Sequence, residues 1–560
     1  MIGFTGIISS TIHLQNTYKK QLKTTDFAVG FSSNKKFNED KIFIETETYI
    51  IGIDGVILNL KELCKGRIWY EFFIDCFENN SNGFLSLFKG AFCGFVYKKN
   101  TQEIRIFNDP CAVKKLFYYS DRNHFIFSSS IKEITNILSK HQISYSLNYR
   151  AAYCLLSYGG LIENDSLVKE IHKLYAAEIV LYDHQAKLKQ FRYYDYNDIE
   201  IKEQGKDQII DSLDHKFNTA IQLEYEKDLE YGYQHFTTLS GGLDSRMNVM
   251  LSAKHGYHNR TNLCFSQSGY LDETIAKKIS HDLNDTHIQI PLDSAEFIRD
   301  IKENGYITDY QNAYGGASHL NFALNKIEDF SSFGIIHSGL IGDGILCGFI
   351  SEPTIKKPNI RAGIQSDMFF HKIENEVESF SKNYKSEDIF QLYNRVFGIT
   401  ITGCFTTEHR SYMLSPFMEK DFLEYSLSIH PKHRFDSRIY INWINSKHKD
   451  LTRYVWEKTK TRPTPFHVNY TSYLYRIERK LKSILGDKTA NSMNPYEHWF
   501  KTKPELYEYY EKFYQDHLQC LNGDIELRQD VEKMFSTHSI LNKVLALSFL
   551  NGVKQLGIKI

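Results

Sequence analysis

The sequence predicts a two-part α/β protein with a β-rich N-terminal half and a C-terminal half built around a parallel sheet. In roughly the first 190 residues, short runs of β-branched and aromatic residues alternate with polar turns, as in Gly90–Lys98. From about residue 202, helical patterns such as Ile209–Leu223 alternate with single apolar strands. That alternation is typical of a parallel sheet. We therefore expect two domains, 1–199 and 200–560.

The expected elements follow from these patterns. In the N-terminal half the predicted strands are Ile42–Ile51, Gly90–Lys98, Ile104–Phe107, His124–Ser128, Ile179–Tyr182 and Phe191–Tyr196. In the C-terminal half the predicted helices are Ile209–Leu223 and Ser366–Leu392, and the predicted strands are Phe236–Leu239, Leu263–Ser266 and Gly334–Ser338. The stretch from about 470 to 560 has a helical pattern without an assignable motif.

Composition excludes several classes of function. The chain has 67 Lys+Arg against 68 Asp+Glu, so its balanced charge argues against a nucleic-acid partner. Its nine cysteines are odd in number and form no C-x-x-C, which indicates a reduced protein without a disulfide framework. Met1–Ser10 lacks a basic region and no apolar run is long enough to span a bilayer. We expect a cytoplasmic protein without a membrane partner; the abundant aromatics are compatible with a homodimer.

A glycine-rich loop follows the first predicted strand of the C-terminal half. Phe236–Leu239 leads into Ser240-Gly241-Gly242-Leu243-Asp244-Ser245, and a helical pattern begins near Asp244. Glycines let backbone N–H groups approach an anion, and the start of a helix attracts negative charge. An ordinary turn capped by Ser240 is the alternative, but the whole string between strand and helix favours phosphate. The loop resembles the pyrophosphate loop of ATP pyrophosphatases and lacks the lysine of a Walker loop.

Two more segments fit the same nucleotide. The strand ending at His337 is followed by Ser338-Gly339 and then by Asp343, which is either a helix cap or a second metal-binding carboxylate beside Asp244. Leu263–Ser266 would end beside the first strand and border an adenine. The predicted cofactors are ATP and Mg²⁺, with Asp244 and Asp343 as metal ligands. The predicted nucleotide-binding residues are Leu239, Ser240, Gly241, Gly242, Asp244, Ser245, Phe265, Ser338 and Gly339.

Together these motifs resemble the asparagine synthetase family over nearly the whole chain. Glu408–Pro431 resembles its E-x-R-x-P-F-L-D region, Asp309–Ile327 its pocket helix and Val455–Pro465 its basic strip. The resemblance implies an N-terminal Ntn-hydrolase-like αββα sandwich of the class II glutaminase type and a C-terminal PP-loop domain. It also implies a catalytic lysine, Lys460, with Lys458 as the nearest competitor.

The pocket helix offers two candidates for a general base that would accept a proton from the incoming amine. Tyr310 and Tyr314 both belong to it, and for each the alternative is a packing aromatic.

The N-terminal half departs from the family pattern at three positions. Ile2 replaces the nucleophilic cysteine, and isoleucine cannot attack an amide. Asp54 replaces an asparagine of the oxyanion site, where its charge would oppose a developing oxyanion. Val56 replaces the glutamate that binds glutamine. We therefore expect a glutaminase in shape only.

The synthetase half also departs from the pattern. Leu340 and Gly344 stand where the family has acids in its second loop. The stretch Gly315–Ser318 contains no basic residue, although aspartate would need one for its α-carboxylate. This absence makes free aspartate a poorer candidate substrate.

Three functions are compatible with these residues. The first is an AMP-forming amide synthetase that joins a small-molecule or peptide carboxylate to an amine without hydrolysing glutamine. It resembles the β-lactam synthetases and lasso-peptide cyclases, and sugar–amino acid amidation fits equally well. The second is an asparagine synthetase that uses free ammonia. The third is a catalytically silent scaffold, which the intact phosphate loop argues against.

Overall fold

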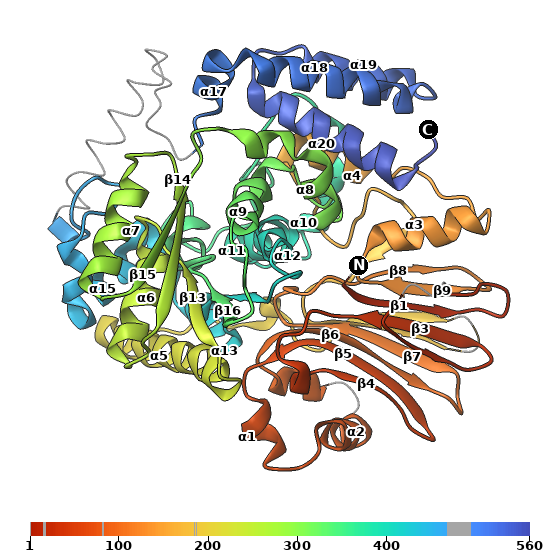
Figure 1. Cartoon of the computed structure of the whole chain (residues 1–560), viewed down its shortest axis with the longest axis horizontal. Coiled ribbons are helices and arrows are strands. Elements are labelled where there is room, and N and C mark those ends of the chain that lie inside the picture. Colours follow the sequence, from red (N-terminus) through yellow and green to blue (C-terminus); the bar gives the residue numbers. More distant parts are fainter. Residues whose placement is uncertain (1, 15–17, 81–82, 184, 186, 467–493) are drawn as a thin grey trace.

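The N-terminal half is a sandwich of two antiparallel sheets with six strands each (Figure 1). The computed structural model describes the whole chain except residues 1, 15–17, 81–82, 184, 186 and 467–493. The first sheet runs in the order β10 (Ile171–Lys173), β8 (Phe117–Ser120), β9 (Phe125–Ser128), β1 (Gly3–Ile8), β3 (Phe27–Ser32) and β2 (Lys20–Lys23). The second runs β12 (Leu188–Arg192), β11 (Glu178–Tyr182), β7 (Glu103–Asn108), β6 (Gly90–Lys98), β5 (Tyr49–Ile57) and β4 (Ile42–Glu45).

Alternating side chains explain why the two sheets stack. Phe4 and Phe27 from the first sheet meet Ile50 and Phe95 from the second in one fully buried aromatic core. On the outer face of the second sheet, Phe73 of helix α2 fills a separate cluster. The outer helices of this half are α1 (Leu60–Cys64), α2 (Trp69–Asn79), α3 (Ile131–Lys140) and α4 (Tyr149–Tyr158). Helix α3 contacts β8 and β9, so helices cover both faces of the sandwich.

The C-terminal half contains the predicted parallel sheet. Its strand order is β15 (Thr286–Pro291), β14 (Arg260–Ser266), β13 (Gln234–Thr238), β16 (Phe333–His337) and β17 (Met413–Leu414). All four neighbouring pairs are parallel, which confirms a mixed α/β chain with a parallel sheet. Helix α5 (Lys206–Glu230) contacts β13 and β16, whereas α7 (Leu271–Asp282) contacts β14 and β15.

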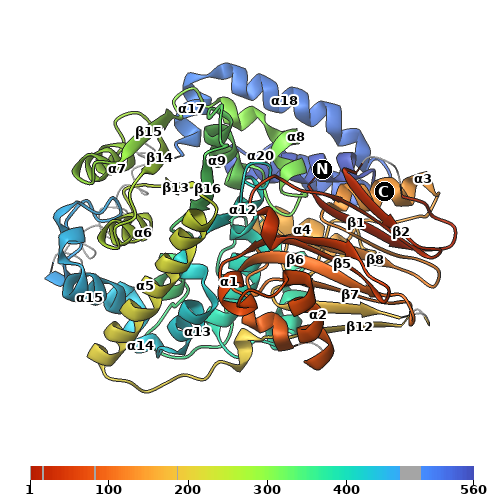
Figure 2. The same ribbon diagram turned by 60° about the horizontal axis from the view of Figure 1, so that its bottom comes forward.

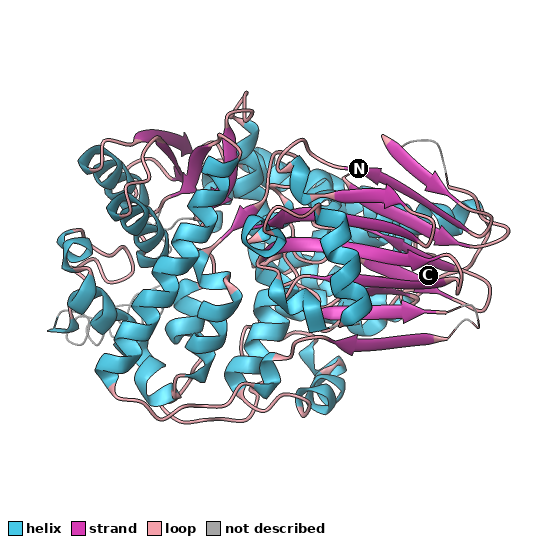
Figure 3. Cartoon of the chain, turned by 90° about the horizontal axis from the view of Figure 1, so that it is seen from below, coloured by secondary structure: helices cyan, strands magenta, loops and turns pink. Residues whose placement is uncertain are grey.

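Helices make up most of what remains (Figures 2 and 3). They are α6 (Leu243–Lys254), α8 (Ile301–Ile307), α9 (Gly315–Asn325), α10 (Glu374–Ser381), α11 (Glu387–Gln391), α12 (Thr402–Phe405), α13 (Lys420–Ser428), α14 (Pro431–Arg434), α15 (Arg438–Lys447), α17 (Tyr496–Thr502), α18 (Pro504–Leu518), α19 (Ile525–Phe535) and α20 (Ile540–Leu556). Two π-helical segments, Gly344–Gly348 and Leu392–Thr400, lie between them. Helix α20 contacts α3 and α4 as well as α8, so it bridges the two halves.

Four expected elements differ from the structure. Of the predicted strand Phe191–Tyr196, only Phe191 and Arg192 lie in β12, and a 3-10 helix begins at Tyr196. The run Ile42–Ile51 is two strands, because a turn in which Thr46 N–H donates to Tyr49 O separates them. The segment Ser366–Leu392 is broken into α10 and α11 by a turn. The pocket helix begins at Gly315, because Asp309 and Tyr310 before it adopt positive φ.

Two further expectations concern the whole chain. The predicted boundary at 199/200 stays a prediction; it lies in the connection between β12 and α5. Among the described residues, no helix has the length and apolar character that crossing a bilayer requires.

Candidate functional site

Two serine–glycine loops meet at the carboxyl ends of neighbouring strands β13 and β16. In parallel sheets this edge is where ligands bind. The loops are in close contact: a Cβ on Gly339 would lie 2.3 Å from the backbone N of Ser245. Asn248 on α6 donates to Ser338 O at 2.9 Å and so ties the second loop to the helix that follows the first. Both loops border one cavity of about 690 Å³.

The first loop is ordered by its own side chains. The backbone N–H of Ser240 donates to Ser245 Oγ at 3.1 Å, and Gly242 N–H donates to Ser240 Oγ at 3.2 Å. Gly241 N–H donates to Asp272 Oδ1 at 2.7 Å. The loop leads directly into α6, whose first turn adds partial positive charge. This arrangement of N–H groups, hydroxyls and helix dipole suits an anion.

Two acidic residues come together where the loops meet. Asp343 N–H donates to Asp244 Oδ2 at 2.9 Å, and the Tyr440 hydroxyl donates to Asp244 Oδ1 at 2.7 Å. Burial, together with the charge of Asp343, raises the pKa of Asp244 to about 8. Burial and the like charge of Asp343 both disfavour the ionised form of Asp244. Oxygen ligands in this arrangement suit Mg²⁺.

Most of the predicted nucleotide-binding and metal-binding residues line this cavity. They are Leu239, Ser240, Gly242, Asp244, Ser245, Phe265, Ser338, Gly339 and Asp343. Gly241 lies beneath the loop and does not line it; a Cβ there would meet Asp272 and Glu457 at 2.9 Å.

Neither Tyr310 nor Tyr314 lines the cavity. Their positions therefore argue against the predicted role as general bases. Both are buried, with exposed fractions of 4% and 1%. The Tyr314 hydroxyl bonds to the hydroxyl of Tyr510 on α18, and its backbone N–H donates to Ser548 Oγ on α20 at 3.1 Å. They are packing aromatics that anchor the C-terminal helices.

The structure favours Lys458 over Lys460 at the cavity. Trp456 N–H donates to Thr461 O at 2.8 Å, which closes a tight turn around both lysines. Lys460 adopts a φ of 56° in this turn and does not line the cavity. Lys458 lines it, with its Nζ 4.0 Å from Asp343 Oδ2. The backbone of the turn thus places Lys458 on the cavity wall, whereas Lys460, the first candidate from the sequence, does not line it.

Among the ionisable residues that line the cavity, four were not predicted from the sequence: Asp272, His319, Arg395 and Glu457. Burial lowers the pKa of His319 to about 4, so its imidazole is neutral at physiological pH. Burial, with a contribution from Asp272, raises the pKa of Glu457 to about 7. Only Glu457 had a local signal, since it directly precedes Lys458.

A buried histidine–carboxylate network lies beneath the second loop. Asp228 Oδ2 is 2.9 Å from His235 Nδ1 and 2.8 Å from His337 Nε2. His337 Nδ1 is 3.1 Å from Glu224 Oε2, and burial raises the pKa of Glu224 to about 7. Three of these groups approach closely enough to hold a metal ion, but their hydrogen bonds to one another already satisfy them. The network fixes α5 against the strands that carry the two loops.

In the N-terminal half, Asp54 is neutralised by lysine. Its Oδ2 is 2.9 Å from Lys114 Nζ, and that ammonium is also 3.0 Å from Glu408 Oε1 in the C-terminal half. Burial alone would raise the pKa of Asp54, but Lys114 and Lys41 together hold it below its usual value. Beside Ile2 the remaining cavity is about 20 Å³, room for about one water.

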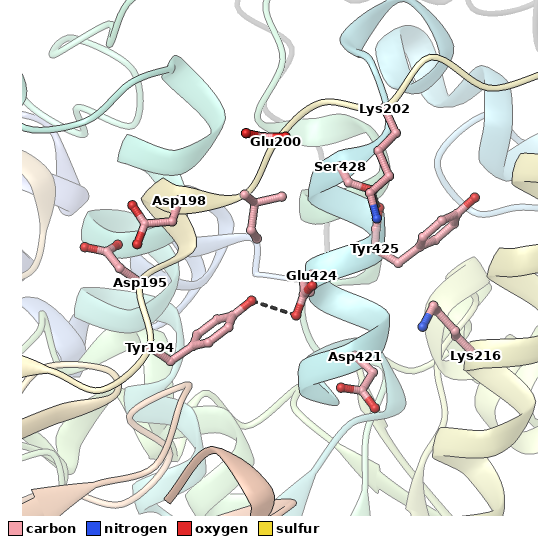
Figure 4. Close-up of a pocket in the computed structure, with 11 residues that line it drawn as sticks. Tyr194, Asp195, Asp198, Glu200, Lys202, Lys216, Asp421, Glu424, Tyr425 and Ser428 are labelled. Atoms are coloured by element: carbon pink, nitrogen blue, oxygen red, sulfur yellow. Dashed lines mark hydrogen bonds between the residues drawn. The ribbon is translucent and has the colours of Figure 1, made fainter. Parts of the chain in front are cut away.

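A second cavity of about 300 Å³ lies between the 194–202 connection and α13 (Figure 4). Five of its eleven lining residues are acidic and two are lysines, and Tyr194 there donates to Glu424 Oε2 at 2.8 Å. It contains none of the predicted site residues. The excess of acids over lysines disfavours the phosphates of a nucleotide there.

The chain is a mixed α/β protein in which an antiparallel sandwich is followed by a parallel sheet. At one edge of the parallel sheet, two serine–glycine loops and two acidic residues border the first cavity. Residues 44–194 match the glutamine amidotransferase domain family. The chain is 24% identical to the putative asparagine synthetase (glutamine-hydrolyzing) 2 of Methanocaldococcus jannaschii over 328 residues. This aligned region covers 56% of each protein. The chain thus spans about half the length of this curated relative. These matches support a relationship with the asparagine synthetase family.

Two solved structures are also similar in part. One is an allosteric regulatory enzyme of purine biosynthesis, at 9% identity over 51% of this chain and 74% of that chain. The other is the glutamine phosphoribosylpyrophosphate amidotransferase from B. subtilis complexed with ADP and GMP, at 10% identity over 51% and 59%. Both have a TM-score of 0.23, too low to add to the family assignment.

Proposed function

We propose that the chain is an ATP-dependent amide synthetase that forms AMP and pyrophosphate. It activates a carboxylate as an acyl-adenylate and passes the acyl group to an amine, without hydrolysing glutamine. One observation carries the proposal: the backbone N–H of Asp343 donates to the Asp244 carboxylate, and both acids line the cavity between two serine–glycine loops at the edge of a parallel sheet. Anion-binding loops next to paired acids suit a metal-bound polyphosphate.

The cavity residues divide the work of holding Mg·ATP. Asp244 and Asp343 would hold Mg²⁺, which supplies charge neutralisation for the departing pyrophosphate. Ser240, Ser245 and the start of α6 would bind phosphate oxygens. Phe265 would border the adenine. Lys458, next to Asp343, would offset the charge that develops on the α-phosphate when the carboxylate attacks it.

The state of the N-terminal half supports the absence of glutamine hydrolysis. Asp54 is committed to an ion pair with Lys114, so it cannot donate to an oxyanion. The cavity beside Ile2 has no room for an amide side chain. The amine would therefore come from a second substrate or from free ammonia, as in the degenerate-glutaminase members of the family.

The products of ATP cleavage test this proposal. Purified protein incubated with ATP, Mg²⁺ and pooled carboxylic acids is expected to catalyse acid-dependent exchange of labelled pyrophosphate into ATP. Glutamine added to the same protein is expected to release no glutamate. Glutamate release would refute the account of the N-terminal half. ATP binding without exchange for any acid would favour a silent scaffold, and exchange restricted to aspartate would favour an ammonia-dependent asparagine synthetase.

Replacing either lysine of the 458–460 turn separates their roles. Lys458→Ala is expected to lower the exchange rate by about 10²-fold, because it removes a cation from the reacting phosphate. Lys460→Ala, a matched change two residues away, is expected to leave the rate within about twofold. The measurement is initial exchange rate at saturating ATP. The reverse order of effects would restore Lys460 as the catalytic lysine.

A further inference from the structure

Arg246 is a fully buried arginine on α6, directly behind the first loop. Its side chain is 0% exposed, although Ser245 before it lines the cavity. Arg246 does not line the cavity itself, and none of the roles assigned to the nucleotide uses it. Arginine is almost never fully buried unless its donors are satisfied. The partners of this side chain therefore indicate what it does.

The guanidinium of Arg246 donates to four backbone carbonyls in two separate segments. Its Nη2 donates to Gly241 O in the first loop at 2.9 Å and to Val455 O at 2.6 Å. Its Nη1 donates to Leu451 O and Tyr454 O, both at 3.2 Å. The planar fork of a guanidinium suits several acceptors at once. One side chain thus joins the first loop to residues 451–455, which are distant in the sequence.

Residues 451–455 lead directly into the turn that carries Lys458, Trp456–Thr461, here called the lysine turn. Within it, Lys460 N–H donates to Trp456 O at 2.7 Å. Glu457 N–H donates at 3.5 Å to Gly241 O, the same carbonyl that Arg246 binds. The place of Lys458 on the cavity wall therefore depends on the segment whose carbonyls Arg246 holds.

The first loop depends less on Arg246 than the lysine turn does. Its N–H groups are already bound by the hydroxyls of Ser240 and Ser245 and by the carboxylate of Asp272. Loss of Arg246 is therefore expected to loosen the lysine turn more than the loop.

The burial of Arg246 is costly, which argues that its bonds matter. Burial lowers the pKa of Arg246 to about 10, so the guanidinium remains charged at physiological pH. In the part of the chain that the structure describes, its hydrogen bonds go to carbonyls and no carboxylate forms an ion pair with it. An apolar side chain of similar volume could fill the space without this desolvation cost. Features that break a local rule in this way occur mainly at functional sites.

We propose that Arg246 is a positioning residue that ties the lysine turn to the first loop and so sets Lys458 against the phosphates bound by that loop. The inference rests on the proposed function for the role of Lys458, whereas the link between the two segments rests on the bonds of Arg246. Lysine cannot replace it fully, because its donors share one nitrogen and cannot span both segments.

Hydrogen exchange of the full chain without nucleotide tests the link. Arg246→Lys keeps the charge and is expected to speed amide exchange in residues 451–461 by about tenfold, and in the first loop by no more than about threefold. Arg260→Lys is the matched control: Arg260 is 2% exposed and pairs with Asp285 at 2.7 Å, at the end of β14 away from the cavity. It should leave exchange in 451–461 unchanged. Unchanged exchange in Arg246→Lys, or equal acceleration in both variants, would overturn the link.

A double-mutant cycle tests whether the link positions Lys458. Calorimetry measures binding of a non-hydrolysable ATP analogue with Mg²⁺. Lys458→Ala is expected to weaken binding by about tenfold in the parent but by no more than about twofold in Arg246→Lys, where the lysine is already displaced. In Arg260→Lys the full tenfold effect should remain. A general loss of stability would lower both affinities of a pair together and leave their ratio unchanged.

The outcomes separate this inference from the proposed function. A tenfold effect of Lys458→Ala in Arg246→Lys would overturn the positioning role. Equal binding by the parent and Lys458→Ala would also overturn it, because no cation would then need positioning. Failure of the analogue to bind the parent would refute the proposed function and with it the role of Lys458, while hydrogen exchange would still decide whether Arg246 links the two segments.

Discussion

Asp244→Asn is expected to lower acid-dependent pyrophosphate exchange by about 10²–10³-fold. Asparagine keeps the shape of the side chain and a partner for the Tyr440 hydroxyl, which donates to Asp244 Oδ1 at 2.7 Å. It removes the negative charge that, with Asp343, would hold Mg²⁺. The measurement is exchange rate against Mg²⁺ concentration, and the variant should need more Mg²⁺ to reach any given rate.

Asp367→Asn is the matched control for this variant. Its carboxylate is 73% exposed and pairs with Arg361, away from the cavity. We expect the control to keep the parental rate and Mg²⁺ dependence. An Asp244→Asn protein that also kept both would show that this acid pair does not hold the metal.

Lys114→Met is expected to destabilise the protein by about 3–5 kcal/mol. Lys114 is 2% exposed and neutralises two buried acids, Asp54 at 2.9 Å and Glu408 at 3.0 Å. Without it, Glu408 loses the cation it pairs with, and Asp54 keeps only the charge of Lys41. Because the ion pairs link the two halves, the variant should unfold at a lower urea concentration in both. The measurement is the unfolding midpoint followed by circular dichroism.

Removing the acids together with the lysine should recover much of that loss. The triple variant Asp54→Asn, Lys114→Met, Glu408→Gln leaves no unpaired charge, so its midpoint should lie between those of Lys114→Met and the parent. Lys99→Met, which breaks a partly exposed pair with Glu45, should cost under about 1 kcal/mol. A Lys114→Met midpoint equal to that of Lys99→Met would contradict the buried linkage.

Much of the fold could be predicted because the signals are local. The run Gly90–Lys98 is one strand in both prediction and structure, since its alternating residues face two packed layers. The parallel sheet follows from apolar strands that end in serine–glycine loops. The prediction was wrong where a local pattern hides a break, as at Thr46 between β4 and β5 or within Ser366–Leu392. The π-helix at Leu392–Thr400 has no sequence signal that distinguishes it from an α-helix.

The candidate site divides in the same way. Asp244 and Asp343 were predicted because each follows its own strand and loop, and adjacent parallel strands bring them together. Arg395 was missed because it reaches the cavity from a helix that only tertiary contacts place there. The choice between Lys458 and Lys460 depends on one backbone turn, which the sequence of a charged run does not specify. Asp54 was predicted to oppose an oxyanion; its pairing with Lys114 across the sequence could not be predicted.

The fate of the α-phosphate of ATP tests the central claim most directly. ATP labelled at the α-phosphate is incubated with the protein, Mg²⁺ and pooled acids and amines, and the labelled nucleotides are separated. The proposed acyl-adenylate route predicts labelled AMP, formed only when acid is present and lost in Asp244→Asn. Labelled ADP as the product, or AMP formation that does not depend on acid, would contradict it.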